Sequence, residues 1–174
     1  MKRIFFVTLL IICTSLGAHE FWLEPQKFTF KRGEHVVLNF KVGENFEGEN
    51  WRGNASSVRS LKLYYGNIQD DLESLIPEDT EGDSLTLQFY DEGTALVAYQ
   101  SNNKHIDLEP AKFLDYLKED GLSNAIEFRE KNGETDSTGR ENYMRCAKTL
   151  FQVGATKDDA YKKYCSMPLE FVPL

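Results

Sequence analysis

The sequence lacks the motifs of the common enzyme classes. It has no GxSxG nucleophile elbow, no HExxH metalloprotease motif, no GxxxxGK[ST] phosphate loop and no GxGxxG dinucleotide fingerprint. Cysteine and histidine are scarce, with three residues of each, and no CxxC pair is present. These absences argue against standard hydrolase and nucleotide chemistry, and we expect a protein that is not an enzyme.

Positive charge is also in short supply. The chain has 20 Lys and Arg residues against 28 Asp and Glu residues. Such an acidic balance argues against nucleic acids and anionic membrane surfaces as partners. It is compatible with a cationic ligand, although an acidic surface that only keeps the protein soluble accounts for it equally simply.

A long apolar run occurs only at the N-terminus. Lys2 and Arg3 precede Ile4–Ile12, and the small residues of Thr14–Ala18 follow. This order of charge, apolar run and small residues is typical of a secretory signal peptide. The run is shorter than the ~20 residues of a membrane-spanning helix, so we expect a periplasmic or secreted protein without a transmembrane segment after cleavage.

The cleavage point decides how the mature chain begins. We expect residues 1–18 to be removed, which leaves His19 first, although cleavage after Gly17 would leave Ala18 first. Cys13 would suit a lipid anchor, but the isoleucine before it is bulkier than the small residue such a signal needs. Removal of the signal takes away two basic residues, and the formal charge of the mature chain becomes −10.

The two remaining cysteines, Cys146 and Cys165, lie in a chain expected to be exported. Disulfides persist outside the cytoplasm, and an even number of cysteines favours pairing. We therefore predict a disulfide between them rather than a metal or redox pair, since no His-Cys metal spacing accompanies them.

Alternation of apolar and polar residues predicts β-strands over much of the first hundred residues. The expected strands cover residues 21–23, 28–30, 35–42, 58–65, 84–89 and 94–99. The last of these is apolar throughout, which is typical of a strand at the centre of a sheet. Residues 43–57 are rich in Gly, Asn and Glu, so we expect an exposed loop that carries Trp51.

The periodicity changes after residue 101. Pro110 and Gly121 bracket one expected helix, and Ser123 and Gly133 bracket a second. Residues 140–146 are compatible with a further helix, and 149–153 and 169–172 alternate like strands. The sequence thus predicts a mainly β protein: one β-sandwich domain, residues 19–174, with a helical insertion at about 109–133.

Six blocks of the mature chain, in order, carry a resemblance to a known family. The blocks are His19–Pro25, Lys41–Gly48, Val97–Ser101, Lys112–Leu122, Arg140–Lys148 and Pro168–Pro173. Together they resemble a family of exported bacterial proteins of uncharacterised function, often labelled periplasmic components of cobalt or nickel uptake. The resemblance implies an Ig-like β-sandwich, a periplasmic or extracellular location, and a role beside a membrane transporter or another envelope protein.

The mature N-terminus offers metal-binding chemistry of its own. His19 would present an imidazole and a free α-amine, whose reference pKa of ~7.7 to 8.0 allows deprotonation near neutral pH. Two such nitrogens suit Ni(II), Co(II), Cu(II) or Zn(II). A useful site needs further ligands, and the candidates are His35, His105, Glu20 and Glu24.

Three functional hypotheses remain open at this point. The chain is an exported metal-binding or accessory protein anchored on His19, or an interaction module that binds no metal. The third and weakest is an oxidative copper enzyme with an N-terminal histidine. Each candidate ligand also has an ordinary structural interpretation, since His35 begins a strand and His105 lies in an alternating segment. Trp51 is either a binding-surface residue or a buried anchor of its loop.

Overall fold

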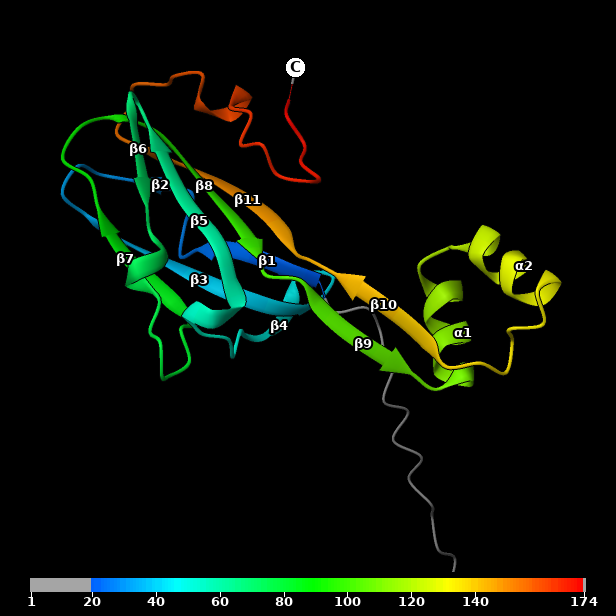
Figure 1. Ribbon diagram of the computed structural model, residues 1–174. Coiled ribbons are helices and arrows are strands. Elements are labelled where there is room, and N and C mark those ends of the chain that lie inside the picture. The colour runs from blue at the N-terminus through cyan, green and yellow to red at the C-terminus, as the bar shows by residue number, and fades with distance from the viewer. Residues whose placement is uncertain (1–19, 174) are drawn as a thin grey trace, which may run out of the picture.

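The computed structural model describes residues 20–173, which form two facing β-sheets and a projecting arm (Figure 1). The four-stranded sheet contains β1 (Glu20–Pro25), β3 (His35–Glu44), β4 (Glu47–Asn50) and β7 (Ser84–Gln88). The five-stranded sheet, in spatial order, contains β2 (Thr29–Phe30), β11 (Cys146–Val153), β8 (Gly93–Ser101), β5 (Val58–Tyr65) and β6 (Ile68–Asp71). Short 3₁₀ helices occur at Ala55–Ser57, Glu73–Leu75 and Ala160–Lys162.

Strand β3 organises the four-stranded sheet. It pairs with β1 on one side and with both β4 and β7 on the other. Side chains alternate between the faces of a strand, and Val36, Leu38 and Phe40 of β3 all point into the interior and are fully buried. The alternation found in the sequence therefore marks the core face of this sheet correctly.

Strand β8 is the centre of the five-stranded sheet, between β5 and β11. Ala95, Val97 and Tyr99 enter the core between the two sheets. Leu96 and Ala98 lie in a second buried cluster on the outer face, which Met167 of the C-terminal segment covers. Burial on both faces explains the continuous apolar run of this strand and confirms its predicted central position.

The chain changes sheets between β1 and β2. Strand β1 pairs with β3, whereas β2 pairs in parallel with the end of β11 in the other sheet. Two facing sheets of mostly antiparallel strands make up a β-sandwich. The predicted fold class, mainly β with helices late in the chain, is confirmed.

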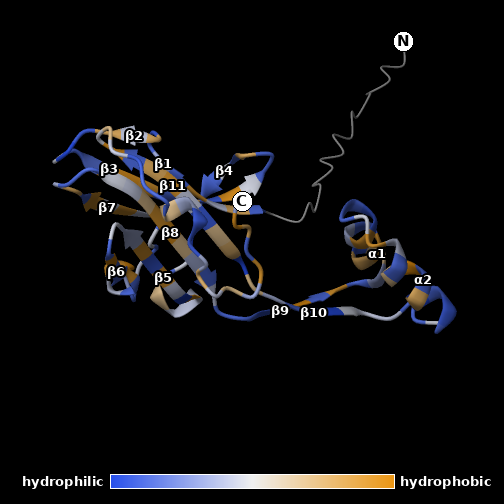
Figure 2. Ribbon diagram, turned by 90° about the horizontal axis from the view of Figure 1, so that it is seen from above, coloured by the Kyte–Doolittle hydropathy of each residue, from blue (hydrophilic) through white to orange (hydrophobic). Residues whose placement is uncertain are grey.

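An arm is inserted between β8 and β11 (Figure 2). Strands β9 (Lys104–Leu108) and β10 (Gly139–Tyr143) form a two-stranded ribbon, and helices α1 (Pro110–Glu119) and α2 (Ser123–Lys131) form its tip. Both helices fall within the predicted insertion. Figure 2 shows the ribbon extending away from the sandwich, so the helices lie apart from both sheets.

The tip is held together by few contacts. Leu117 is its one buried helical residue. The Phe113 ring lies against Gly139, where a Cβ would come within 2.0 Å of it. The Arg129 guanidinium lies 4.8 Å from the centre of the same ring, and an Arg129 nitrogen donates to the Glu134 carbonyl at 2.6 Å. The ring and the guanidinium therefore join α1 to α2 and to the ribbon.

The expectation of a helix over residues 140–146 is wrong, because residues 139–143 form β10. The segment is mostly polar, so its hydrophobic pattern carries little information. Its pairing with β9 is instead supported by polar contacts across the ribbon, namely an ion pair of Arg140 with Asp107 and a hydrogen bond of Asn142 with His105. The alternation at residues 169–172 is also misleading, since that segment forms no strand.

The expectation of a loop over residues 43–57 is wrong in its first half, which forms a hairpin of two strands. β3 continues to Glu44 and turns through Asn45 and Phe46 into β4, whose four residues are all exposed. Trp51 follows with only 4% of its surface exposed. Its backbone N–H donates a hydrogen bond to the Phe40 carbonyl at 2.8 Å. Trp51 is therefore a buried anchor of its segment, not a binding-surface residue.

No helix among residues 20–173 is long and apolar enough to span a membrane. The longest, α1, has ten residues, about half of what a bilayer requires.

Replacement of Leu117 by Ala tests whether the tip folds separately from the sandwich. Loss of a buried leucine costs about 2–5 kcal/mol, which we expect to unfold the tip alone. Hydrogen exchange should then accelerate over residues 109–138 while β3, β8 and β11 stay protected. Leu122→Ala, at an exposed leucine of the same tip, is the matched control. Equal loss of protection from hydrogen exchange in the sandwich strands would contradict separate folding of the tip.

The predicted disulfide is not formed in the structure, in which Cys146 and Cys165 are both free. Both nevertheless pack against the same outer cluster, so we propose that they pair on oxidation. The bridge would raise the free energy of unfolding by about 3 kcal/mol for a loop of this length. Non-reducing peptide mapping of the exported protein should find the cross-link. Cys146→Ser should remove both the cross-link and the added free energy of unfolding. Two alkylatable thiols without prior reduction would refute it.

Candidate functional site

The histidine His105 lies on the arm, in β9. Its Nδ1 is 3.0 Å from the Asn142 side-chain oxygen, and its Nε2 is 3.3 Å from an Asp107 carboxylate oxygen. Both ring nitrogens therefore have polar partners within the ribbon. Half of the side chain is exposed, and its local role is to support the pairing of β9 with β10.

The histidine His35 lies at the opposite end of the four-stranded sheet from the start of β1. It is the first residue of β3, whereas Glu20 pairs with Gly43 near the far end of that strand. Eight residues of β-strand span about 27 Å. His35 therefore cannot join a metal site at the mature N-terminus. It is exposed, and its backbone carbonyl accepts a hydrogen bond from Gln26 at 3.0 Å.

The third histidine, His19, lies outside the described residues, which begin one position later. Glu20 is the first residue of β1 and is exposed. Its register partner is Gly43, and Glu44 follows Gly43 on β3. Glu20 therefore lies at the end of the four-stranded sheet where β3 turns into β4.

The end of β1 is anchored by aromatic packing. The Phe21 ring lies 4.4 Å from the Tyr99 ring and 6.0 Å from the Trp51 ring, measured between centres. The Arg145 guanidinium lies 5.9 Å from the Phe21 ring centre. Burial raises the pKa of Tyr99 to about 12, so its phenol stays neutral. These residues position the strand end and offer no acid or base.

The carboxylates near this end do not form a cage. Glu44, Glu47 and Glu49 line an open pocket of about 960 Å³ on the β3–β4 hairpin. Within residues 20–173, however, no three His, Cys, Asp or Glu side chains come together in an arrangement that could hold a metal ion. Glu24, the remaining predicted candidate, accepts from Asn39 through its backbone carbonyl. Of the predicted ligands that the structure describes, His35, His105, Glu20 and Glu24 are therefore not brought together.

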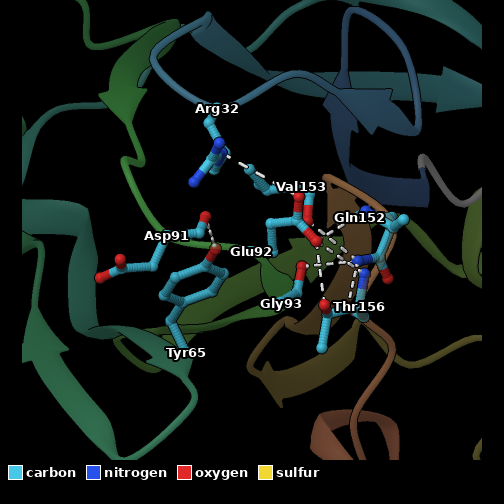
Figure 3. Close-up of polar contacts among 9 residues, drawn as sticks. Arg32, Tyr65, Asp91, Glu92, Gly93, Gln152, Val153 and Thr156 are labelled. Atoms are coloured by element: carbon cyan, nitrogen blue, oxygen red, sulfur yellow. Dashed lines mark hydrogen bonds and ion pairs between the residues drawn. The ribbon is translucent and has the colours of Figure 1, made fainter.

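The densest polar network surrounds Glu92, in the turn before β8 (Figure 3). Its carboxylate accepts hydrogen bonds from the Thr156 hydroxyl at 2.9 Å and from the N–H groups of Ala155 and Thr156 at 3.2 Å. These bonds, the hydroxyl first, lower the pKa of Glu92 below its usual range. Nearby, the Tyr65 hydroxyl donates to the Asp91 carbonyl at 2.6 Å. Because the Glu92 carboxylate accepts three hydrogen bonds from Ala155 and Thr156, this network connects the turn before β8 to the segment after β11.

A second polar pair ties the C-terminal segment to β11. Lys148 forms an ion pair with Glu170, whose side chain is almost completely buried. Burial tends to raise the pKa of Glu170, but bonds from Lys148 and from the N–H groups of Cys165 and Met167 lower it overall. Charged residues this buried are nearly always paired, and this pair fixes the tail over the outer cluster.

Sequence reasoning missed Glu92, Lys148 and Glu170, because each lies in an ordinary polar context. Glu92 lies between the predicted strands 84–89 and 94–99, and Gly154 gives the one available signal. Its φ is +67°, and a Cβ there would come within 2.4 Å of the Glu92 side chain. A glycine directly after a predicted strand is consistent with such a close approach, but it does not identify the partner.

Comparison with protein families matches residues 16–174, nearly the whole chain, to a model described as Domain of unknown function (DUF4198). No curated protein and no solved structure matches the chain.

The lowered pKa of Glu92 predicts a pH-dependent contribution to stability. A carboxyl group whose pKa is lower in the folded state stabilises the fold above its unfolded pKa, near 4.3, and this contribution is lost as pH falls through the folded value. Glu92→Gln should therefore lower the melting temperature at pH 7 and converge with the wild type at acid pH. Glu81→Gln, at an exposed carboxylate, is the control. A difference that persists unchanged to pH 2 would contradict the assignment.

Proposed function

We propose that this chain, which belongs to the DUF4198 family, is an exported binding or accessory protein whose mature N-terminus chelates a divalent transition metal. The metal is Ni(II), Co(II), Cu(II) or Zn(II), and the chelating group is the α-amine and imidazole of His19. The observation that carries the proposal is that Glu20, the residue after the expected first residue of the mature chain, is held in the ladder between β1 and β3 opposite Gly43. A chelating terminus would thus be attached directly to a paired strand.

Attachment to the strand supports chelation because it reduces the entropy lost on binding. Glu20 is held in the ladder with Gly43, and Phe21 is packed against Tyr99. If the mature chain starts at His19, its amine and imidazole belong to the residue next to this fixed backbone. A flexible N-terminal tail with the same histidine would lose more conformational freedom on binding a metal.

Glu44 is the residue that we propose as the third ligand. It follows Gly43, the register partner of Glu20, so it is the carboxylate of β3 closest in register to the strand end. Two nitrogens and one carboxylate oxygen form a ligand set that these metals accept. His35 is about 27 Å along the strand, and both ring nitrogens of His105 have partners on the arm. The proposal therefore leaves these two histidines outside the ligand set.

An interaction module without metal is the second candidate, and the arm favours it. Leu122 and Phe128 at the tip are exposed, the latter by 61%. Exposed apolar side chains on an element that projects from the molecule are compatible with a protein-binding surface. The partner would be a membrane transporter or another envelope protein. Under this alternative, partner binding survives His19→Ala and removal of metal, and it is lost on Phe128→Ala.

The metal proposal is tested on exported protein whose first residue has been established by N-terminal sequencing. Calorimetric titration with each of the four metals should detect binding that weakens from pH 8 to pH 6, because protons compete for the amine and the imidazole. His19→Ala should abolish this binding, and Glu44→Gln should weaken it by about tenfold, as expected for the loss of a supporting carboxylate.

The control is the double variant His35→Ala/His105→Ala, which keeps the same number of exposed acidic groups and should bind as the wild type does. Undiminished binding by His19→Ala, or a mature chain that starts at Ala18, would overturn the proposal.

A further inference from the structure

The sulfur-containing side chains of residues 20–173 gather at one place. There are four of them, Met144, Cys146, Cys165 and Met167. Both cysteines and Met167 belong to the cluster on the outer face of the five-stranded sheet, where the C-terminal segment covers β8. Met144 lies two residues before Cys146, the first residue of β11. A stretch of chain with so little sulfur thus places all of it at one site.

The side chain of Gln100, on β8, connects the four. Gln100 is the register partner of Cys146, so their Cβ atoms lie about 5 Å apart on the same face of the sheet. Its Nε2 donates to the Met144 sulfur at 3.5 Å. Gln100 also lines a cavity of about 210 Å³ together with Cys165 and Met167. One nearly buried amide therefore borders all four sulfur-containing side chains.

Solvent reaches these side chains through two cavities. The first is the cavity beside Cys165 and Met167. The second, of about 320 Å³, is lined by Met144 and Cys146, and also by Pro168, the residue after Met167. Both cysteines are free thiols and are only half-buried. An ion in solution can therefore approach the cluster.

The backbone of the C-terminal segment fixes two of the four residues. The N–H groups of Cys165 and Met167 donate to the Glu170 carboxylate at 3.0 and 3.2 Å. Ser166, between them, has a φ of 59°, which is uncommon for a residue other than glycine. The Glu170 carboxylate is also paired with Lys148. This carboxylate is thus fully engaged, and the groups left free at the site are sulfur atoms.

Thioether and thiolate sulfur together favour a soft metal ion. Ligands of this kind select Cu(I), whereas zinc sites are built from cysteine, histidine and carboxylate ligands. The lack of a His–Cys spacing in the sequence therefore does not bear on a copper(I) site. Burial raises the pKa of the Cys165 thiol, so this group keeps its proton until a metal ion displaces it.

We propose that the reduced protein binds one Cu(I) ion through four sulfur atoms, those of Met144, Cys146, Cys165 and Met167. Each thiol releases its proton to solvent as its sulfur–copper bond forms, and no electron is transferred, because copper enters as Cu(I). A disulfide between the cysteines removes both thiolates, so the bridge and the ion exclude one another. The site does not use His19 and is separate from the divalent metal site proposed above.

The test is a competition for Cu(I) under nitrogen. Mature protein is reduced with a phosphine, freed of it, and titrated into the coloured complex of Cu(I) with bathocuproine disulfonate. The wild type should remove one equivalent of Cu(I) and so reduce the colour. Cys146→Ser and Cys165→Ser should each weaken Cu(I) binding by more than about 100-fold, because the loss of a ligand exceeds the loss of an outer-shell partner.

The methionines are tested by replacements that preserve volume. Met144→Leu and Met167→Leu keep the packing nearly unchanged, and each should weaken Cu(I) binding by about tenfold, the lower end of the range for groups that support a metal. Melting temperatures close to that of the wild type would show that both variants are folded. These variants therefore separate copper binding from folding, even if a cysteine variant is unstable.

Three controls accompany these variants. Leu169→Ala removes a side chain that is 69% exposed and lines the second cavity without contributing sulfur, and it should bind Cu(I) as the wild type does. His19→Ala should also keep its Cu(I) affinity, so failure of the N-terminal site and failure of this site can be told apart. Protein oxidised to the disulfide should leave the colour unchanged.

Several results would overturn the proposal. These are the absence of Cu(I) transfer to the reduced wild type, wild-type affinity in both cysteine variants, or wild-type affinity in both methionine variants. Loss of Cu(I) binding in His19→Ala alone would also refute it, because copper would then be held at the N-terminus.

Discussion

Burial of β8 on both faces is the constraint on which the rest of the structure depends. One face of the strand completes the core between the sheets, and the other requires cover that neither sheet can provide. The C-terminal segment supplies that cover through Met167, and it is held in place by Lys148 with Glu170 and by the bonds that Glu92 accepts. The polar clusters around Glu92 and around Lys148 with Glu170 look most like functional sites. They thus hold in place the segment that covers the apolar strand.

The sequence predicts those parts of the fold in which hydrophobic periodicity reports burial. It locates β3, β5 and β8, and the helices of the arm, since their apolar residues repeat at strand or helix spacing. It fails at β4, whose residues are all exposed, and at β10, where the only buried residue is a glycine and pairing rests on backbone hydrogen bonds and polar contacts. Trp51 was hidden for a related reason, because its polar neighbours belong to an exposed hairpin while its own ring turns inward.

The candidate sites were harder to predict than the fold. Residue type alone drew attention to the histidines, but strand register separates His35 from the N-terminus and ribbon pairing occupies His105. The cysteine count predicted a link between β11 and the C-terminal segment, but nothing in the sequence indicated that two methionines lie beside it. What brings the four sulfur-containing side chains together is the path of that segment over the outer face of the five-stranded sheet, a property of three-dimensional placement.

The way the arm leaves the sandwich has a consequence for its reach. Gln100 and Cys146 are register partners, so the chain departs and returns at adjacent points of one ladder, and the sandwich does not need the arm to close. Ribbon and helix together extend on the order of 30 Å from that base. Over this length, a tilt of about ten degrees at the base moves the tip by about 5 Å, roughly the spacing of two paired strands. A small tilt at the base would therefore displace the tip by several ångströms without any change in the register of either sheet.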